Sequence, residues 1–233
     1  MEFHEVVRRR RMVRRFDPDR PVAASALDEV LYAAQRAPSA GFSQGWDFVV
    51  LAEAADRKQF WAATRDPDLP DAPLDGWLAG VSAAPVLVLC LSDPDTYLDR
   101  YAEPDKGWTD RDPARWPVPY WDVDTGMAAM LMLLAAVDQG LGALFFGIPP
   151  VQHERVRRAH GIPDNRRLVG VVALGHERTR TEGSSRSRAR RTTTEVVHWG
   201  HFGGADNALS GGADNALSGA DHGFSGESGA GPV

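Results

Sequence analysis

The sequence has a single cysteine and no apolar run long enough to cross a membrane. Cys90 is the one cysteine among 233 residues, so no disulfide forms within the chain and a reducing, cytoplasmic compartment is expected. It lies in the apolar run "PVLVLCL", which is typical of an inert buried thiol. The start of the chain lacks the apolar region of a secretory signal. The longest apolar stretch, 126–140, is shorter than the roughly 20 residues that span a bilayer, so no membrane partner is expected.

Several catalytic signatures are also missing. There is no phosphate-binding loop of the NTPase type, and no G-x-G-x-x-G follows a strand. The glycines of "GLGALFFG" follow a helical pattern, so Gly140 and Gly142 are predicted to end a helix and form a turn. The spacing of His198 and His201 favours solvated or core-edge histidines, so no metal site is predicted. No Ser/His/Asp set emerges from position alone, and no catalytic side chain is assigned.

The overall charge argues against a polyanionic partner. Lys and Arg number 26 against 32 Asp and Glu, a formal charge of −6, and the tail 203–233 carries four of the acids with no base. The remaining body is close to neutral, whereas nucleic-acid-binding domains are usually basic. Against this stands "RRRRMVRRF" (8–16), which has six arginines in nine positions. A nucleic acid, a membrane surface or one phosphate-bearing cofactor would each attract such a run, and a solvated charged face would also explain it.

Hydrophobic periodicity predicts a single mixed domain over 1–202. We expect a short helix at the N-terminus, a helix over 26–37 capped by Ser25, and irregular structure over the aromatic segment 93–122. The other expected helices are 53–64, 126–139 and 151–160, the last closed by Gly161. The expected strands are 47–51, 84–92, a strand at the start of 143–150, and 168–175. This order indicates an α+β or α/β fold.

The last segment, 203–233, has a different composition. The octapeptide "GGADNALS" occurs twice in succession and then decays into Gly, Ala, Ser and Asp. Such a segment buries too little apolar surface to offset the entropy of ordering. We therefore predict a low-complexity, disordered tail without a catalytic role.

Three separated segments have residues suited to an anion or a flat ligand. The arginines of 10–14 and those of 188–191 form forks that grip phosphate through two hydrogen bonds. Between them, the small residues of "PSAGFSQGW" (38–46) let the backbone approach a bulky group. Two clusters and one loop could enclose one phosphate-bearing ligand without making the whole protein basic.

Several stretches together resemble the nitroreductase family of FMN-dependent oxidoreductases. They are "RRRRMVRRFDPDRPV", "APSAGFSQGWDFVVL", "MAAMLMLLAAVDQGLGA", "FFGIPPVQHERVRRAHGIPD", "VGVVALGH" and "RRTTTEVVHWG", in the family's order over residues 3–202. The resemblance implies a mostly antiparallel central sheet flanked by helices, in an intertwined homodimer. Each of its two FMN sites would contain residues of both subunits, and the apolar helix 126–139 fits an interface as well as an interior.

The resemblance also implies which residues bind FMN. An N-terminal stretch would hold the phosphate and the flavin edge, a loop would reach the flavin of the partner subunit, and a turn would supply a backbone N–H near flavin N5. A C-terminal pair would complete the phosphate site. Met12 stands where many members have serine, Phe42 where asparagine is common, and Gly45 where proline is common. The residues in these positions are Arg10, Arg11, Met12 and Arg14; Pro38, Ser39, Ala40, Gly41, Phe42 and Gln44; Gly147 or Ile148; and Arg188 with Arg190.

The reaction implied is a ping-pong transfer of hydride from NADPH or NADH through FMN to a planar acceptor, a nitroaromatic or a quinone. The aromatic segment 93–122 would form part of the acceptor site, or it would pack the dimer. Three alternatives stay open: a specialised enzyme on the same fold (a reductive dehalogenase or a heterocycle dehydrogenase), a flavin-binding protein without turnover, and a nucleic-acid binder through the arginine run.

Overall fold

A four-stranded antiparallel sheet forms the centre of the chain, in the order β1-β2-β4-β3. The computed structural model describes residues 1–65, 75–178 and 189–205. It divides the chain into two compact units, Met1–Thr181 and Glu182–Val233. The strands of the first unit are β1 (Trp46–Leu51), β2 (Val86–Ser92), β3 (Gly142–Phe146) and β4 (Arg167–Gly175).

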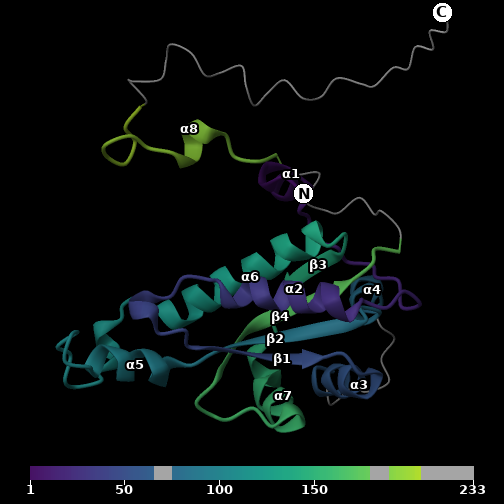
Figure 1. Ribbon diagram of the computed structural model, residues 1–233, viewed down its shortest axis with the longest axis horizontal. Helices are drawn as coiled ribbons and strands as arrows, with labels where there is room; N and C mark the ends of the chain where they lie inside the picture. Colours follow the sequence, from purple (N-terminus) through teal and green to yellow (C-terminus); the bar gives the residue numbers. More distant parts are fainter. Residues whose placement is uncertain (66–74, 179–188, 206–233) are drawn as a thin grey trace, which may run out of the picture. The chain divides into compact units, whose positions relative to one another are not determined.

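Helices cover both faces of this sheet (Figure 1). The pair α2 and α6 lies on one face, and α3 and α7 lie on the other. The helices of the first unit are α1 (Phe3–Arg9), α2 (Ala24–Gln35), α3 (Ala54–Ala63), α4 (Gly76–Ser82), α5 (Pro94–Ala102), α6 (Tyr120–Asp138) and α7 (His153–His160), with short 3-10 turns η1 (Ala40–Phe42), η2 (Pro113–Arg115) and η3 (Pro150–Gln152). The predicted α+β fold with an antiparallel sheet between helices is confirmed.

Strand β2 shows why the sheet needs helices on both sides. Every residue of β2 is buried, and successive side chains of a strand point to opposite faces. Leu87, Leu89 and Leu91 join the core shared with α3, α4 and α7. Val88 and Cys90 join the core shared with α2 and α6. Cys90 is fully buried, as predicted, and burial raises the pKa of its thiol to about 12.

Helix α6 is the longest of the described helices and has four fully buried side chains along one face, Thr125, Ala128, Met132 and Ala136. By length and composition alone it is apolar enough to cross a membrane. Its packing against α2 and the sheet explains this composition as that of a core helix. The chain then turns at Gly140, whose φ of +71° fits the predicted helix terminator, while Gly142 begins β3.

Three local predictions differ from the structure. Ser25 does not cap α2, because the helix begins at Ala24 and its N-cap, Ala23, has no side-chain hydrogen bond. The segment 93–122 is not irregular throughout: Asp93 caps α5 by accepting from the Asp95 N–H, with Pro94 in the first turn. Helix α4, capped by Asp75, was not predicted. For α4 and α5 a single capping aspartate sets the boundary, and hydrophobic periodicity does not register it.

Candidate functional site

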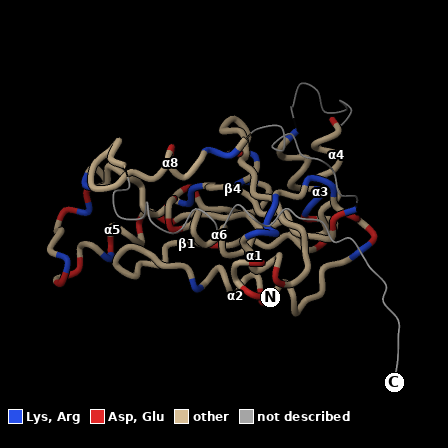
Figure 2. The backbone as a smooth tube through the Cα atoms, turned by 90° about the horizontal axis from the view of Figure 1, so that it is seen from above, with Lys and Arg blue, Asp and Glu red and all other residues tan. Residues whose placement is uncertain are grey.

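The arginine-rich segment leaves α1 as an extended chain that runs beside β3. Met12 forms a parallel bridge with Ala143, and the Val13 N–H donates to the Ala143 carbonyl at 2.9 Å. Val13 is buried, whereas Arg10, Met12 and Arg14 are half-buried. Because side chains alternate along an extended segment, these three share one face. Figure 2 shows the basic run at α1 among otherwise interspersed acidic and basic residues.

Arg10 and Arg14 have guanidiniums that no described carboxylate neutralises. Arg10 makes no hydrogen bond or ion pair with any described residue, and Arg14 reaches only the Met12 carbonyl, at 3.5 Å. Guanidinium groups on one face are the donors that a phosphate prefers. The predicted phosphate residues Arg10 and Arg14 therefore fit that role, with Met12 between them supplying no hydroxyl donor.

Arg11 lies on the other face, with Val13. Its guanidinium hydrogen-bonds both carboxylate oxygens of Glu177, whose side chain is 15% exposed. The hydrogen bond that Arg11 donates to Glu177 raises the pKa of Arg11. The structure thus separates Arg11 from the face formed by Arg10, Met12 and Arg14.

The loop 38–44 is tightly turned and exposes an aromatic ring. Gly41, Phe42 and Gln44 all have positive φ, at +62°, +57° and +54°. Only glycine adopts this region without strain, and a Cβ at Gly41 would lie 2.8 Å from the Tyr101 ring. The Phe42 side chain is 76% exposed. This exposed ring and the strained residues around it are typical of a surface that another group covers.

Three side-chain contacts hold this loop. The Ser39 hydroxyl accepts from the Gln44 N–H at 2.9 Å. The Ser43 hydroxyl donates to the Ala40 carbonyl at 2.7 Å. From α5, Arg100 Nε donates to the Gly41 carbonyl at 3.0 Å. Pro38 is exposed and ends the segment that follows α2.

Asp124 fixes the loop to α6. It is 2% exposed, and its Oδ2 accepts from the Ala40 N–H and from the Tyr97 hydroxyl, both at 2.8 Å. Burial, with this hydrogen bond next in effect, raises the pKa of Tyr97. Sequence reasoning missed Asp124, Tyr97 and Arg100. Asp124 lies two residues before the apolar helix pattern of 126–139, so that pattern gave no signal for it.

The turn after β3 presents backbone to solvent. Gly147 is exposed, and no atom lies within 4 Å of where its Cβ would be. Ile148 is 8% exposed and its carbonyl bonds His153 Nε2 at 2.9 Å. Within the described residues, the N–H groups of Gly147 and Ile148 have no acceptor. A planar ligand could therefore approach this turn closely and accept a hydrogen bond from it.

These segments are not brought together in one chain. The loop 38–44 is held at the start of α6 by Asp124, and Met12 lies beside Ala143, just beyond the other end. From Asp124 to Ala136 the helix rises about 18 Å. Helix α5 contacts η1 of the loop, and α4 contacts the end of the arginine segment through the Phe16 N–H and the Gly80 carbonyl. In Figure 1 these two helices lie at opposite ends of the sheet.

The remaining predicted residues lie in the second unit or outside the described residues. Arg190 is exposed in the second unit, shortly before α8 (Thr193–Val196). Arg188 lies outside the described residues. Among the described residues, no group of three His, Cys, Asp or Glu side chains is placed to hold a metal ion.

Comparisons with known proteins agree with one another. The model of the nitroreductase family matches residues 7–176. A protein of Archaeoglobus fulgidus, provisionally named NADH dehydrogenase/NAD(P)H nitroreductase, is 29% identical over 178 residues, which is 75% of this chain and 85% of that protein. A protein of Thermus thermophilus named NADH dehydrogenase is 29% identical over 187 residues, 72% of this chain and 83% of that protein.

Solved structures share the fold at lower identity. The nitroreductase CinD of Lactococcus lactis, in complex with nicotinic acid, has a TM-score of 0.68 and 17% identity, over 84% of this chain and 98% of its own. A provisionally named nitroreductase of Exiguobacterium sibiricum, in complex with FMN, has a TM-score of 0.66 and 18% identity, over 85% and 97%. Since the family model covers most of the first unit, the chain belongs to the nitroreductase family of oxidoreductases.

Proposed function

We propose that this protein binds FMN and uses it to carry electrons from NADPH or NADH to a nitroaromatic, a quinone or a related planar acceptor. The observation that carries the proposal is the pair Arg10 and Arg14, which face one way with no carboxylate partner among the described residues. The relative from Exiguobacterium sibiricum, solved with FMN, supports the choice of cofactor.

The phosphate of FMN would lie against Arg10 and Arg14, with Met12 as an apolar contact between them. The C-terminal arginines Arg188 and Arg190 would complete the anion site, as the family resemblance implies. Charge-assisted bonds to phosphate are worth about 1.5–3 kcal/mol each. Several of them anchor a ligand even though one hydroxyl donor is missing at Met12.

The exposed turn after β3 would present the reacting edge of the ring with a hydrogen-bond donor. Gly147 or Ile148 can donate, because both N–H groups are free among the described residues. Pro149 and Pro150 have no N–H and cannot. Bound FMN would supply the redox chemistry, accepting hydride from NADPH or NADH and then reducing the acceptor. The protein supplies position and positive charge, and no side chain need act as an acid or base.

The aromatic segment after α5 would bound the acceptor site at its exposed end. Trp116 packs edge-on against Tyr101 and Tyr120, at centroid distances of 4.7 and 5.8 Å. Most of these rings cover one another, but Tyr120 is 43% exposed. Its ring is thus available to a planar acceptor, whereas the inner rings have a packing role.

The single buried thiol, Cys90, suits a reducing, cytoplasmic compartment.

A homodimer would complete each site. The loop 38–44 is held at the start of α6, and the Arg10–Arg14 segment lies beyond the other end of this helix, which rises about 18 Å between Asp124 and Ala136. One chain alone would therefore not place both against one flavin. A second copy can supply the loop. Along α6 an apolar stripe is exposed at helical spacing, which offers the contact surface. Its members are Tyr120, Val123, Met127 and Met130.

An anaerobic absorption spectrum of the purified protein tests the proposal. We expect the visible absorption band of oxidised flavin, which bleaches on addition of NADPH or NADH and returns with a quinone. A flavin band that neither nucleotide bleaches would instead indicate a flavin-binding protein without turnover. Reduction without reoxidation by quinones or nitroaromatics would indicate a specialised enzyme. A colourless protein that FMN does not saturate would refute the proposal.

A further inference from the structure

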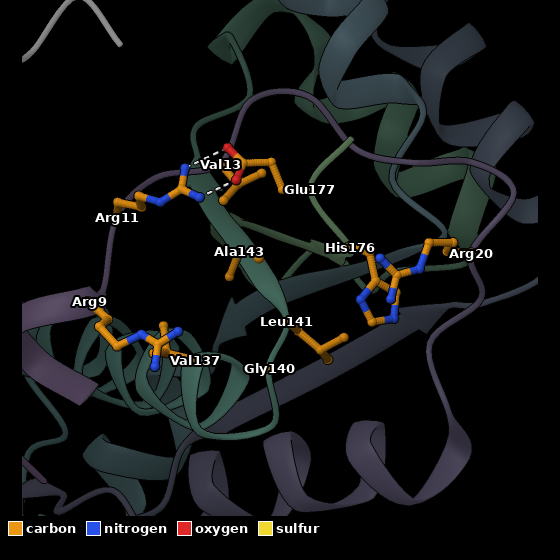
Figure 3. A pocket seen from close by; sticks show the side chains of 11 residues that line it. Arg9, Arg11, Val13, Arg20, Val137, Gly140, Leu141, Ala143, His176 and Glu177 are labelled. Carbon is orange, nitrogen blue, oxygen red and sulfur yellow. Dashed lines mark hydrogen bonds and ion pairs between the residues drawn. The ribbon is translucent and has the colours of Figure 1, made fainter. Parts of the chain in front are cut away.

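A basic pocket lies on the face of the arginine segment that the proposed flavin site does not use. It has a volume of about 360 Å³ and lies between α1, the end of α6, the start of β3 and the segment after β4 (Figure 3). The residues that line it are Arg9, Arg11, Val13, Arg20, Val137, Gly140, Leu141, Gly142, Ala143, His176 and Glu177.

The lining carries an excess of positive charge. Among the described residues, Glu177 is the one carboxylate in the lining, and both of its oxygens accept hydrogen bonds from Arg11. Arg20 is exposed and makes no hydrogen bond or ion pair with any described residue. Arg9 meets a carboxylate only at Glu5, at 3.8 Å and with 59% of its side chain exposed, a pair that contributes little. Two guanidiniums therefore remain for a ligand, beside a third that Glu177 holds in place.

The rest of the lining shapes a cavity for more than a bare ion. Figure 3 shows His176 beside Arg20 on one side, with Arg9 and Arg11 on the other. Leu141 and Val137 supply apolar surface between them. Gly140, at φ +71°, leaves open space where a Cβ would lie. A volume of about 360 Å³ is at the lower end for small-molecule sites, so a phosphate with a small attached group fits better than an oxyanion alone.

This pocket is separate from the proposed flavin site. Arg10, Met12 and Arg14 do not line it. Alternation along the extended segment directs Arg11 and Val13 to the opposite side, and Glu177 fixes Arg11 there. The run "RRRRMVRRF" thus divides between two faces, each with its own arginines.

We propose that this pocket binds a small phosphomonoester through Arg9, Arg11 and Arg20, independently of the flavin. The phosphate oxygens accept hydrogen bonds from the three guanidiniums, and the attached group lies over Leu141 and Val137. Glu177 acts as a positioning residue, since it holds the Arg11 fork.

Calorimetric titration of the full-length protein, saturated with FMN and in a buffer free of phosphate, tests this. The probes are inorganic phosphate, ribose 5-phosphate and ribose. We expect ribose 5-phosphate to bind more tightly than inorganic phosphate, ribose not to bind, and the affinity to fall with added salt. The first two probes distinguish a phosphomonoester from free phosphate as the ligand.

Two variants and a control locate the binding. Arg20→Gln and Arg9→Gln should each weaken ribose 5-phosphate binding about tenfold or more and leave FMN content unchanged. Arg36→Gln, at an exposed arginine after α2, should change neither. Equal affinities for Arg20→Gln and Arg36→Gln would overturn the proposal. So would the absence of saturable binding, or phosphate binding that occurs only when FMN is removed.

Discussion

At the scale of single residues, neighbours in sequence have different tasks because an extended chain alternates its side chains. Arg10 and Arg14 face a proposed phosphate site, whereas Arg11 is paired with Glu177 on the other side. The resemblance to the family implies that Arg11 also contributes to the flavin site, and a motif records order along the chain and not the direction of a side chain. The motif does not show that Glu177 lies beside Arg11.

Arg10→Ala should weaken FMN binding about 10- to 150-fold, because one charge-assisted bond to phosphate worth about 1.5–3 kcal/mol is lost. Arg190→Ala should have a similar effect. Fluorescence titration of the flavin-free protein with FMN measures both. Arg8→Ala is the matched control, since Arg8 is exposed and paired with Glu5 at 2.8 Å. If both site variants keep the affinity of the control, the assignment is wrong.

Asp124→Ala should destabilise the protein by about 2–5 kcal/mol. The change leaves the Tyr97 hydroxyl and the Ala40 N–H without their acceptor, and each unpaired buried group costs about 1–3 kcal/mol. Urea unfolding measures the free energy. Asp99→Ala, which removes an exposed ion pair with Arg111, should cost less than about 1 kcal/mol. Equal losses for the two variants would contradict the role of Asp124.

Tyr97 should make stability depend on alkaline pH. Burial raises its pKa in the folded state above the ordinary value of about 10. Below pH ~10 the tyrosine is protonated in both states, so its contribution to the free energy of unfolding is complete. Above pH ~10 the unfolded state loses a proton that the folded state keeps, so the free energy of unfolding falls by about 1.4 kcal/mol per pH unit. Urea unfolding at pH 9 and pH 11 should show this extra loss in the wild type and not in Tyr97→Phe, which has no hydroxyl to titrate. An equal loss of stability between pH 9 and pH 11 in the wild type and in Tyr97→Phe would refute this role of Tyr97.

At the scale of elements, α6 links the two halves of the proposed site and keeps them apart. Its buried face packs on α2 and the sheet, its first turns hold the loop 38–44 through Asp124, and its last turn leads to the strand beside Met12. The periodicity of 126–139 predicted a buried helix. It did not show that the helix begins six residues earlier, at Tyr120, or that its exposed side carries an apolar stripe.

Met127→Glu should weaken the proposed dimer about a hundredfold or more. An unpaired charge buried in an interface costs about 3–5 kcal/mol, and Met127 is 39% exposed in the single chain, so folding should survive. The sedimentation coefficient at micromolar concentration and the flavin content should both decrease, because the variant becomes monomeric and loses the cofactor. Gly41→Glu in the loop should act likewise. Ala55→Glu, exposed on α3, serves as the control. A flavin-loaded monomer in either variant would contradict the hypothesis that each flavin site contains residues of both subunits.

At the scale of the whole molecule, the first unit contains the sheet, its helices and the pocket of Figure 3. In the second unit, the described residues 189–205 hold a short helix with a capping box between Thr192 and Glu195. They also contain a local turn, in which Trp199 donates to the Gly204 carbonyl at 3.0 Å. The repeats after this turn lie outside the described residues.

Removal of the repeats should leave the enzyme intact, because their composition provides no large apolar side chains for a core. Truncation after Ala205 keeps the turn at Gly204. We expect a melting temperature within a few degrees of the full-length value, which corresponds to less than about 1 kcal/mol, and unchanged flavin content. A loss of ten degrees or more would show that the tail contributes to the folded structure.

The sequence by itself determined the elements whose pattern is local. Strands β1, β2 and β4 and helices α2, α3 and α7 follow from runs of apolar residues at a period of 2 or 3.6, and Gly161 ends α7 with φ +62°, as predicted. The residues of the proposed flavin site are predicted from the family order of motifs. These inferences need only neighbours along the chain.

Only the tertiary structure decided which residues meet. That Arg11 binds Glu177, 166 positions away, and that Asp124 holds Ala40, 84 positions away, depends on how the sheet and α6 bring distant segments together. Those contacts place Arg11 in the lining of the basic pocket and put the loop 38–44 at the start of α6, away from Met12. The physical reason is that a charge or hydrogen bond has no period along the chain, so its partner appears only when the chain is folded.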